Sequence, residues 1–280
     1  MLRSLLVALD GIADHAAAVD TALALARATG ARLELRPVLD RARLEAPEAV
    51  PLGGEAFRRH AVEARTAQLD ARLTAIEAEL AARLRREGVD GQLVRLDGDA
   101  VRDLAFAAEA HDLLVLPNAL RRRRHEEAAE TELALPLGEL VPACARPMLL
   151  ADARPLAPGS AVAAYDGSPG AARALHAALL LGLLDGREVH VVTVAAARAE
   201  ALAHAEQAAL LVARHGLAAR AHGLEGSGSF ADELLAQIEA LEPALVVMGA
   251  FGRRSWRERL FGAVTHHLID RVEAPLLLSS

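Results

Sequence analysis

Three glycines close to the C-terminus have the spacing of a loop that holds phosphate. Gly249 ends the aliphatic run Ala244 to Met248, two residues separate it from Gly252, and nine separate Gly252 from Gly262. Glycine adopts positive φ and lets backbone amides approach a ligand closely. A strand followed by a glycine loop and a helix start is a common phosphate site of α/β proteins. The stretch therefore predicts an anion-binding loop. The alternative interpretation is a tight turn over the sheet, with the site vacant or adapted to another ligand.

A second polar stretch follows a short aliphatic run in the same half of the chain. Asp166 and Gly167 come directly after Ala161 to Tyr165. If the strands of an open parallel sheet lie in the order 3-2-1-4-5, a ligand binds between the carboxyl ends of strands one and four. Asp166 and Gly249 follow those two strands, so both stretches are expected at one site. The glycine fingerprint of a dinucleotide-binding dehydrogenase is absent after the first strand.

Short aliphatic runs alternate with amphipathic helical stretches along the chain. This alternation predicts an α/β fold in which helices cover both faces of a parallel sheet. Ser168 and Pro169 form a suitable N-cap and first turn for a helix. That helix is expected to run to about Leu184 and to be terminated by Gly186. A longer helix, rich in Ala, Glu and Arg, is expected from Phe57 to Glu87.

The chain contains one unit twice. Asp10 corresponds to Asp166 at an offset of 156 residues, and the offset falls to 132 between Leu113 and Leu245 because the first copy carries extra residues. Each copy is long enough to form its own core. A segment with Pro and Gly residues around Ala153 separates the copies. Two tandem domains are therefore expected, residues 1–153 and 154–280.

Composition limits the classes of function. The net charge of −7 argues against a general nucleic-acid binder. The only cysteine, Cys144, excludes an intrachain disulfide and is expected to be a small buried hydrophobic residue. The apolar run Leu5 to Leu9 is too short for a signal sequence or a membrane span, so a cytoplasmic protein without a membrane partner is expected. None of the eleven histidines has a metal-ligand spacing, and no metal site is expected.

The glycine spacing and the strand-end aspartate resemble those of the universal stress protein family, over almost the whole chain and in tandem form. ATP-binding members of that family show Gly, two residues, Gly, nine residues, Gly and then Ser or Thr, whereas this chain has Ala263 where the hydroxyl is expected. A lost hydroxyl contact to phosphate costs roughly 1.5–3 kcal/mol, but the backbone amide at that position is retained. The resemblance implies twelve nucleotide-binding residues: Ala164, Tyr165, Asp166, Val194, Met248, Gly249, Gly252, Arg253, Gly262, Ala263, Val264 and Thr265.

The first copy has lost the glycine loop. Pro117, which lacks an amide donor, occupies the position of Gly249, and Ala134 occupies that of Gly262. The first copy is therefore expected not to bind nucleotide in this manner. The run Arg121 to Arg124 could hold an anion or an acidic partner, but three glutamates follow it, which favours a solvated and self-paired loop.

The resemblance also implies the architecture and the function. Each copy would be a Rossmann-like, doubly wound domain of the adenine nucleotide alpha hydrolase-like type, with a five-stranded parallel sheet in the order 3-2-1-4-5. The last strands, Met148 to Leu150 and Leu276 to Leu278, would pair and make the chain an intramolecular pseudo-dimer, and a further homodimer stays open. The implied function is a stress-response or regulatory module that binds ATP, with or without Mg²⁺, in the second domain.

Two other functions stay open. A nucleotide-free interaction or scaffold protein of the same fold would use only its surfaces. A slow ATPase or phosphotransferase would need a water-activating residue or a metal-binding carboxylate. No partnered Ser, His or second carboxylate is evident beside Asp166, so no catalytic residue is assigned.

Overall fold

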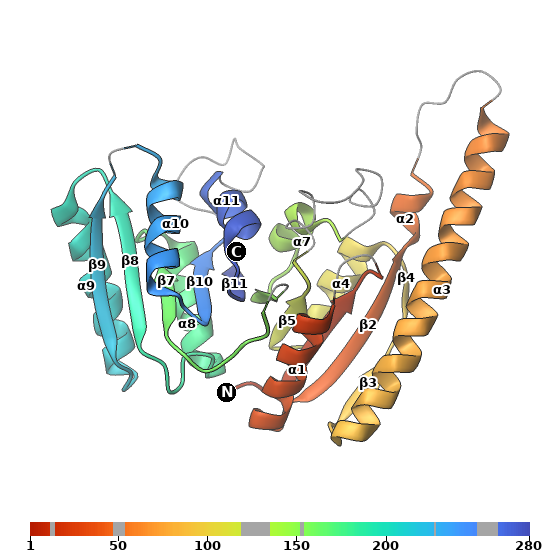
Figure 1. The fold of residues 1–280 in the computed structure, drawn as a ribbon, viewed down its shortest axis with the longest axis horizontal. Coiled ribbons are helices and arrows are strands. Elements are labelled where there is room, and N and C mark those ends of the chain that lie inside the picture. The colour runs from red at the N-terminus through yellow and green to blue at the C-terminus, as the bar shows by residue number, and fades with distance from the viewer. Residues whose placement is uncertain (12–14, 47–53, 119–134, 152–153, 227, 251–262) are drawn as a thin grey trace.

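The aliphatic strands of both halves join one twisted sheet (Figure 1). The computed structural model describes residues 1–11, 15–46, 54–118, 135–151, 154–226, 228–250 and 263–280. The strands of the first half are β1 (Ser4–Leu9), β2 (Arg32–Asp40), β3 (Gly91–Leu93), β4 (Leu96–Gly98), β5 (Leu113–Leu116) and β6 (Met148–Leu150). Those of the second half are β7 (Ala161–Ala164), β8 (Val189–Ala195), β9 (Ala219–Glu225), β10 (Leu245–Gly249) and β11 (Leu276–Ser279).

The strands lie in the order β3-β2-β1-β5-β6-β11-β10-β7-β8-β9, and β4 also pairs with β2. All the neighbouring strands are parallel except β6 and β11, which are antiparallel, with Leu276 opposite Leu150 and Leu278 opposite Met148. The predicted pairing of the last two strands is thereby confirmed. In the first half β1 lies between β2 and β5, and in the second half β7 lies between β8 and β10, so the chain reverses its winding direction at these first strands.

The third strand of the first half is interrupted. β3 and β4 both pair with β2, and Val94 and Arg95 separate them. At the interruption the Arg95 guanidinium contacts Asp70 at 2.5 Å and Glu77 at 3.3 Å, and both acids lie on α3 (Glu55–Glu87). The first half therefore has two short strands where one was expected.

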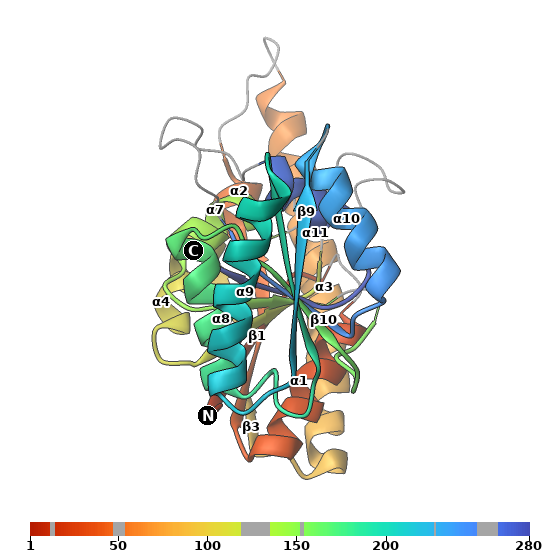
Figure 2. The ribbon, with the colours of Figure 1, turned by 90° about the vertical axis from the view of Figure 1, so that its left-hand side faces the viewer.

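Helices cover both faces of the sheet, as Figure 2 shows from the side. One hydrophobic cluster contains buried side chains of α1 (Ala16–Thr29), α3, α8 (Pro169–Leu181) and α9 (Arg198–Arg214). The cluster on the other face contains those of α4 (Ala100–Ala108), α7 (Leu137–Ala143), α10 (Phe230–Leu241) and α11 (Ala263–Arg271). The short helix α2 (Arg41–Leu44) adds Leu44 to a third, smaller cluster with α3.

The beginning of α8 agrees with the sequence prediction and its end does not. The Ser168 hydroxyl accepts a hydrogen bond from the Ala171 amide at 3.2 Å, as expected of an N-cap. The helix ends at Leu181, because Gly182 takes a left-handed conformation with φ of 76° and terminates it. Gly186 also has a positive φ, but it lies in the following turn, so the expected end near Leu184 was wrong. The long helix α3 is present as predicted.

Within the part of the chain that the structure describes, no helix is both long and apolar enough to cross a membrane.

Candidate functional site: the strand ends of the second half

Four half-buried apolar side chains gather at one edge of the second half. They come from the carboxyl ends of three neighbouring strands and the first turn of α11, and they pack on the same hydrophobic cluster: Ala164, Val194, Leu224 and Val264. We call these four residues the apolar floor. The register sets Val194 opposite Leu224, so these two side chains lie side by side. Met248, at the end of β10, is buried in the same cluster. The floor offers an apolar surface that remains partly open.

The Asp166 carboxylate is exposed directly beyond β7. Its Oδ1 accepts a hydrogen bond from the Ser168 amide at 2.9 Å. Gly167 has a φ of 73°, and a Cβ added there would lie 2.9 Å from the ring of His204. The turn therefore packs on an imidazole of α9 and presents the carboxylate of Asp166 outwards. An exposed carboxylate can accept hydrogen bonds from the hydroxyls of a ligand.

Only the backbone of Tyr165 lies at the site, because its side chain packs on the opposite face of the sheet. The Tyr165 amide donates to the Val192 carbonyl at 2.9 Å, and its own carbonyl accepts from the Thr193 hydroxyl at 2.6 Å. These bonds fix the end of β7 against β8. The phenol is therefore directed away from the apolar floor, because successive strand residues point to opposite faces.

The structure needs a glycine at position 249 for a different reason from the one that the sequence suggests. Its φ is not positive, whereas eight other glycines of the described chain have positive φ. A Cβ added at Gly249 would lie 2.5 Å from the Ala171 nitrogen and 2.6 Å from the Gly170 carbonyl carbon. The missing side chain gives room to the backbone at the start of α8. The conformational argument for Gly249 was therefore wrong, and close packing replaces it.

Thr265 ties the start of α11 to the end of β10. Its side chain is 3% exposed, and its hydroxyl donates to the Ala250 carbonyl at 3.0 Å. Ala263 is the first residue of the helix. Three predicted site residues, Gly252, Arg253 and Gly262, lie outside the residues that the structure describes. The described site residues therefore come from β7, β8, β10 and the first turn of α11.

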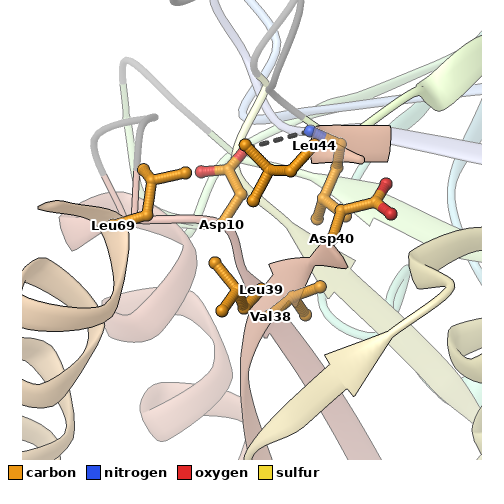
Figure 3. A pocket seen from close by; sticks show the side chains of 7 residues that line it. Asp10, Val38, Leu39, Asp40, Leu44 and Leu69 are labelled. Carbon is orange, nitrogen blue, oxygen red and sulfur yellow. Dashed lines mark hydrogen bonds between the residues drawn. The ribbon is translucent and has the colours of Figure 1, made fainter. Parts of the chain in front are cut away.

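The equivalent strand ends of the first half are covered. Asp10 is 5% exposed, and its Oδ2 accepts a hydrogen bond from the Leu135 amide at 3.1 Å. Val38, which corresponds to Val194 in the repeat, is 2% exposed. A small pocket remains there, with a volume of about 10 Å³, which holds no more than a water molecule. The residues that line it are Asp10, Val38, Leu39, Asp40, Leu44, Leu69 and Leu135. Figure 3 labels the first six of them.

Asp40 at the rim of this pocket is a helix cap. Its Oδ1 accepts a hydrogen bond from the Arg43 amide at 3.2 Å at the start of α2. Burial raises the pKa of the Asp40 carboxyl above its usual value, because desolvation disfavours the charged form. The carboxylate therefore serves the local fold of the first half.

The other residues that the sequence singles out either have a structural role or lie outside the described residues. The Cys144 side chain is 2% exposed, and burial raises the pKa of its thiol, so the expected small buried residue is confirmed. Pro117 follows β5 as expected, whereas Ala134 and the run Arg121 to Arg124 lie outside the described residues. Among the described residues, no three His, Cys, Asp or Glu side chains gather as a metal site.

Sequence reasoning missed two residues of this region. Leu224 lies one residue before the end of β9, and the rule that the carboxyl ends of parallel strands lie at one edge would have found it. His204 carries no local signal, because its contact with Gly167 joins a helix and a loop far apart in sequence.

Comparison with known proteins agrees with the fold. Two solved structures have the same fold over 99% of the chain: a universal stress protein from Archaeoglobus fulgidus DSM 4304 and a protein of unknown function from Pseudomonas aeruginosa PAO1. The first is 17% identical in sequence, with a TM-score of 0.66 and 96% of its own length covered. The second is 19% identical, with a TM-score of 0.63 and 92% of its own length covered. A search of curated proteins found no match. The model of the universal stress protein family matches residues 1–127 and again 160–279, so this chain belongs to that family.

Proposed function

We propose that this chain binds an adenine nucleotide, ATP with or without Mg²⁺, at the strand ends of its second half. The protein then acts as a cytoplasmic, nucleotide-responsive module in stress response or regulation. One comparison carries the proposal. Asp10 and Val38 are buried in the first half, whereas the equivalent Asp166 is exposed and Val194 is half-buried in the second. The same two positions are closed in one copy and open in the other.

Each part of the open site fits one part of a nucleotide. The apolar floor suits the flat face of adenine, because burial of apolar surface is favourable without directed bonds. The Asp166 carboxylate suits the ribose hydroxyls, since a charged acceptor makes strong hydrogen bonds with hydroxyl donors. The first-turn amides of α11 suit the phosphates, because a helix N-terminus presents unpaired N–H groups and a positive dipole end.

Isothermal titration calorimetry of the full chain with ATP tests the proposal. Asp166→Ala is expected to weaken ATP binding about ten- to a hundredfold, the equivalent of roughly 1.5–3 kcal/mol for hydrogen bonds to a charged group. Asp10→Ala is the matched control at the equivalent position of the first half. It removes the acceptor of the Leu135 amide and is expected to lower stability without changing the affinity for ATP. Absence of binding at millimolar ATP, or equal affinity in Asp166→Ala, would refute the proposal.

A nucleotide-free scaffold protein is the second candidate, and two observations favour it. Gly249 serves the packing of α8, and the Thr265 hydroxyl is used inside the protein. Native mass spectrometry of the purified chain separates the two candidates. Adenine nucleotide that copurifies with the wild type and is lost in Asp166→Ala excludes the scaffold function.

A further inference from the structure

Asn118 connects the two halves at the C-terminal end of α11. It follows β5 in the first half, its side chain is 5% exposed, and its Nδ2 donates to the Ile269 carbonyl of α11 at 2.7 Å. The two residues are 151 positions apart in the chain. The contact therefore attaches the first half to a helix of the second half.

The carbonyl that accepts this bond lies in the last turn of α11. The last four carbonyls of a helix have no intrahelical donor. The Val272 amide donates a hydrogen bond to the Leu268 carbonyl at 2.8 Å, and the Asn118 side chain donates one to the next carbonyl, that of Ile269. Asn118 thus supplies a C-terminal cap to α11 from the other half of the molecule.

The opposite end of α11 is the one proposed to face phosphate. There the Thr265 hydroxyl binds the Ala250 carbonyl of the same half. The helix has nine residues, and at a rise of about 1.5 Å per residue its two ends are about 13 Å apart. Because so short a helix is close to a rigid body, loss of the cap at its C-terminus is expected to change the position of its N-terminus.

Asn118 and Ala250 are equivalent positions of the repeat, at the offset of 132 residues. Alanine has no side-chain donor, so the second half offers no matching cap. Asn118 Oδ1 is buried, and it has no hydrogen-bond partner among the described residues. Because an unpaired buried oxygen is unfavourable, packing alone does not account for an amide there.

Building on the proposed function, we infer that Asn118 is a positioning residue for the nucleotide site. The first half, whose own strand ends are closed, supports the open site of the second half. Asn118 holds α11 so that its first-turn amides face the phosphates. Loss of this cap affects ligands with phosphate groups and spares adenosine, which has none.

Affinity measurements with ATP and with adenosine test this inference. Asn118→Leu keeps the approximate volume and removes both the donor and the unpaired oxygen, and Asn118→Ala is a second variant. Both are expected to weaken ATP binding about three- to tenfold, while adenosine affinity stays within about twofold of the wild type. Thr21→Val is the matched control, because it removes the hydroxyl that accepts the Leu156 amide at 2.8 Å on α1, which packs on the other face of the sheet from α11. It should lower stability and leave both affinities unchanged.

Hydrogen–deuterium exchange of the ligand-free variants supplies an independent readout. The α11 amides are expected to exchange faster in Asn118→Leu than in the wild type. In Thr21→Val their exchange rates are expected to be unchanged. Equal loss of ATP and adenosine affinity, unchanged ATP affinity, or unchanged α11 exchange overturns the inference. If the wild type binds neither ligand, the proposed nucleotide function fails and the role of Asn118 towards phosphate fails with it. Faster α11 exchange would then support only the cap itself.

Discussion

Two aspartates at equivalent positions differ in what surrounds them. Asp10 is enclosed and accepts the Leu135 amide, whereas Asp166 is exposed and accepts only its neighbouring Ser168 amide among the contacts that the structure describes. A carboxylate that is enclosed and bonded stabilises a loop, and one that faces solvent can bind a ligand. The chemistry of a repeated residue therefore depends on what covers it.

Gly249 permits a prediction at the same scale. Gly249→Ala would place a methyl group 2.5 Å from the Ala171 nitrogen, which is backbone and cannot rotate away. We expect a loss of about 2–3 kcal/mol in the free energy of unfolding, in the range of overpacked cores. Urea denaturation of the variant measures this loss.

Gly228→Ala is the control for Gly249, because nothing lies within 4 Å of a Cβ added there. Its free energy of unfolding should stay within about 0.5 kcal/mol of the wild type. An equally small effect at Gly249 would show that α8 can move away from β10.

At the scale of elements, local patterns predict most of the second half. Aliphatic runs give the strands, and Ser168 with Pro169 gives the start of α8, because capping depends on neighbours in sequence. The predicted end of α8 is wrong because two glycines near it, Gly182 and Gly186, both take a positive φ, and the earlier one terminates the helix. The interruption of the third strand in the first half was not predicted either, since Arg95 pairs with two acids of the preceding helix α3 that lie 18 and 25 residues away in sequence.

The candidate site is predictable to the extent that it follows from strand ends. Asp166 and Val194 are found because each lies at the carboxyl end of a parallel strand in a recognisable repeat. The reason for Gly249 is not predictable, because it depends on how closely α8 approaches β10. The closure of the first half is not predictable either, since Leu69 lines the small pocket beside Asp10 only because of how the long helix α3 packs.

The outer strands β8 and β9 carry a pair of histidines, and this pair predicts that the stability of the fold depends on pH. His190 Nδ1 lies 3.0 Å from His222 Nε2. Burial, then the charges of His190 and Arg220, lower the pKa of His222 below its usual value of 6.5. The folded protein thus binds fewer protons than the unfolded chain. The stability linked to His222 is therefore complete above pH 6.5 and is lost as the pH falls through the lowered pKa.

We expect the free energy of unfolding to decrease between pH 7.5 and about pH 5, and to decrease less in His222→Gln. Urea denaturation across this range measures the difference. The control is His215→Gln, because His215 is exposed at the end of α9. A His222→Gln protein with the wild-type pH dependence would contradict the assignment of this effect to the pair.

At the scale of the whole molecule, the antiparallel pair β6 and β11 joins two parallel sheets into one. Leu276, Leu277 and Leu278 are at most 2% exposed, so this junction is as buried as the core of either half. Without its partner each strand would be an apolar sheet edge, which favours association with another chain. The halves thus protect one another, and Asn118 adds a polar link between them.

This arrangement predicts how the halves behave when separated. A fragment of residues 154–280 is expected to fold and to form a homodimer, because β11 can pair antiparallel with β11 of a second copy as it does with β6. Sedimentation equilibrium over a range of concentrations measures this association. Adding a fragment of residues 1–151 should convert the homodimer into a one-to-one complex, since β6 then competes for the same edge. If the 154–280 fragment stays monomeric, or does not bind the 1–151 fragment, the β6–β11 junction does not drive the assembly of the two halves.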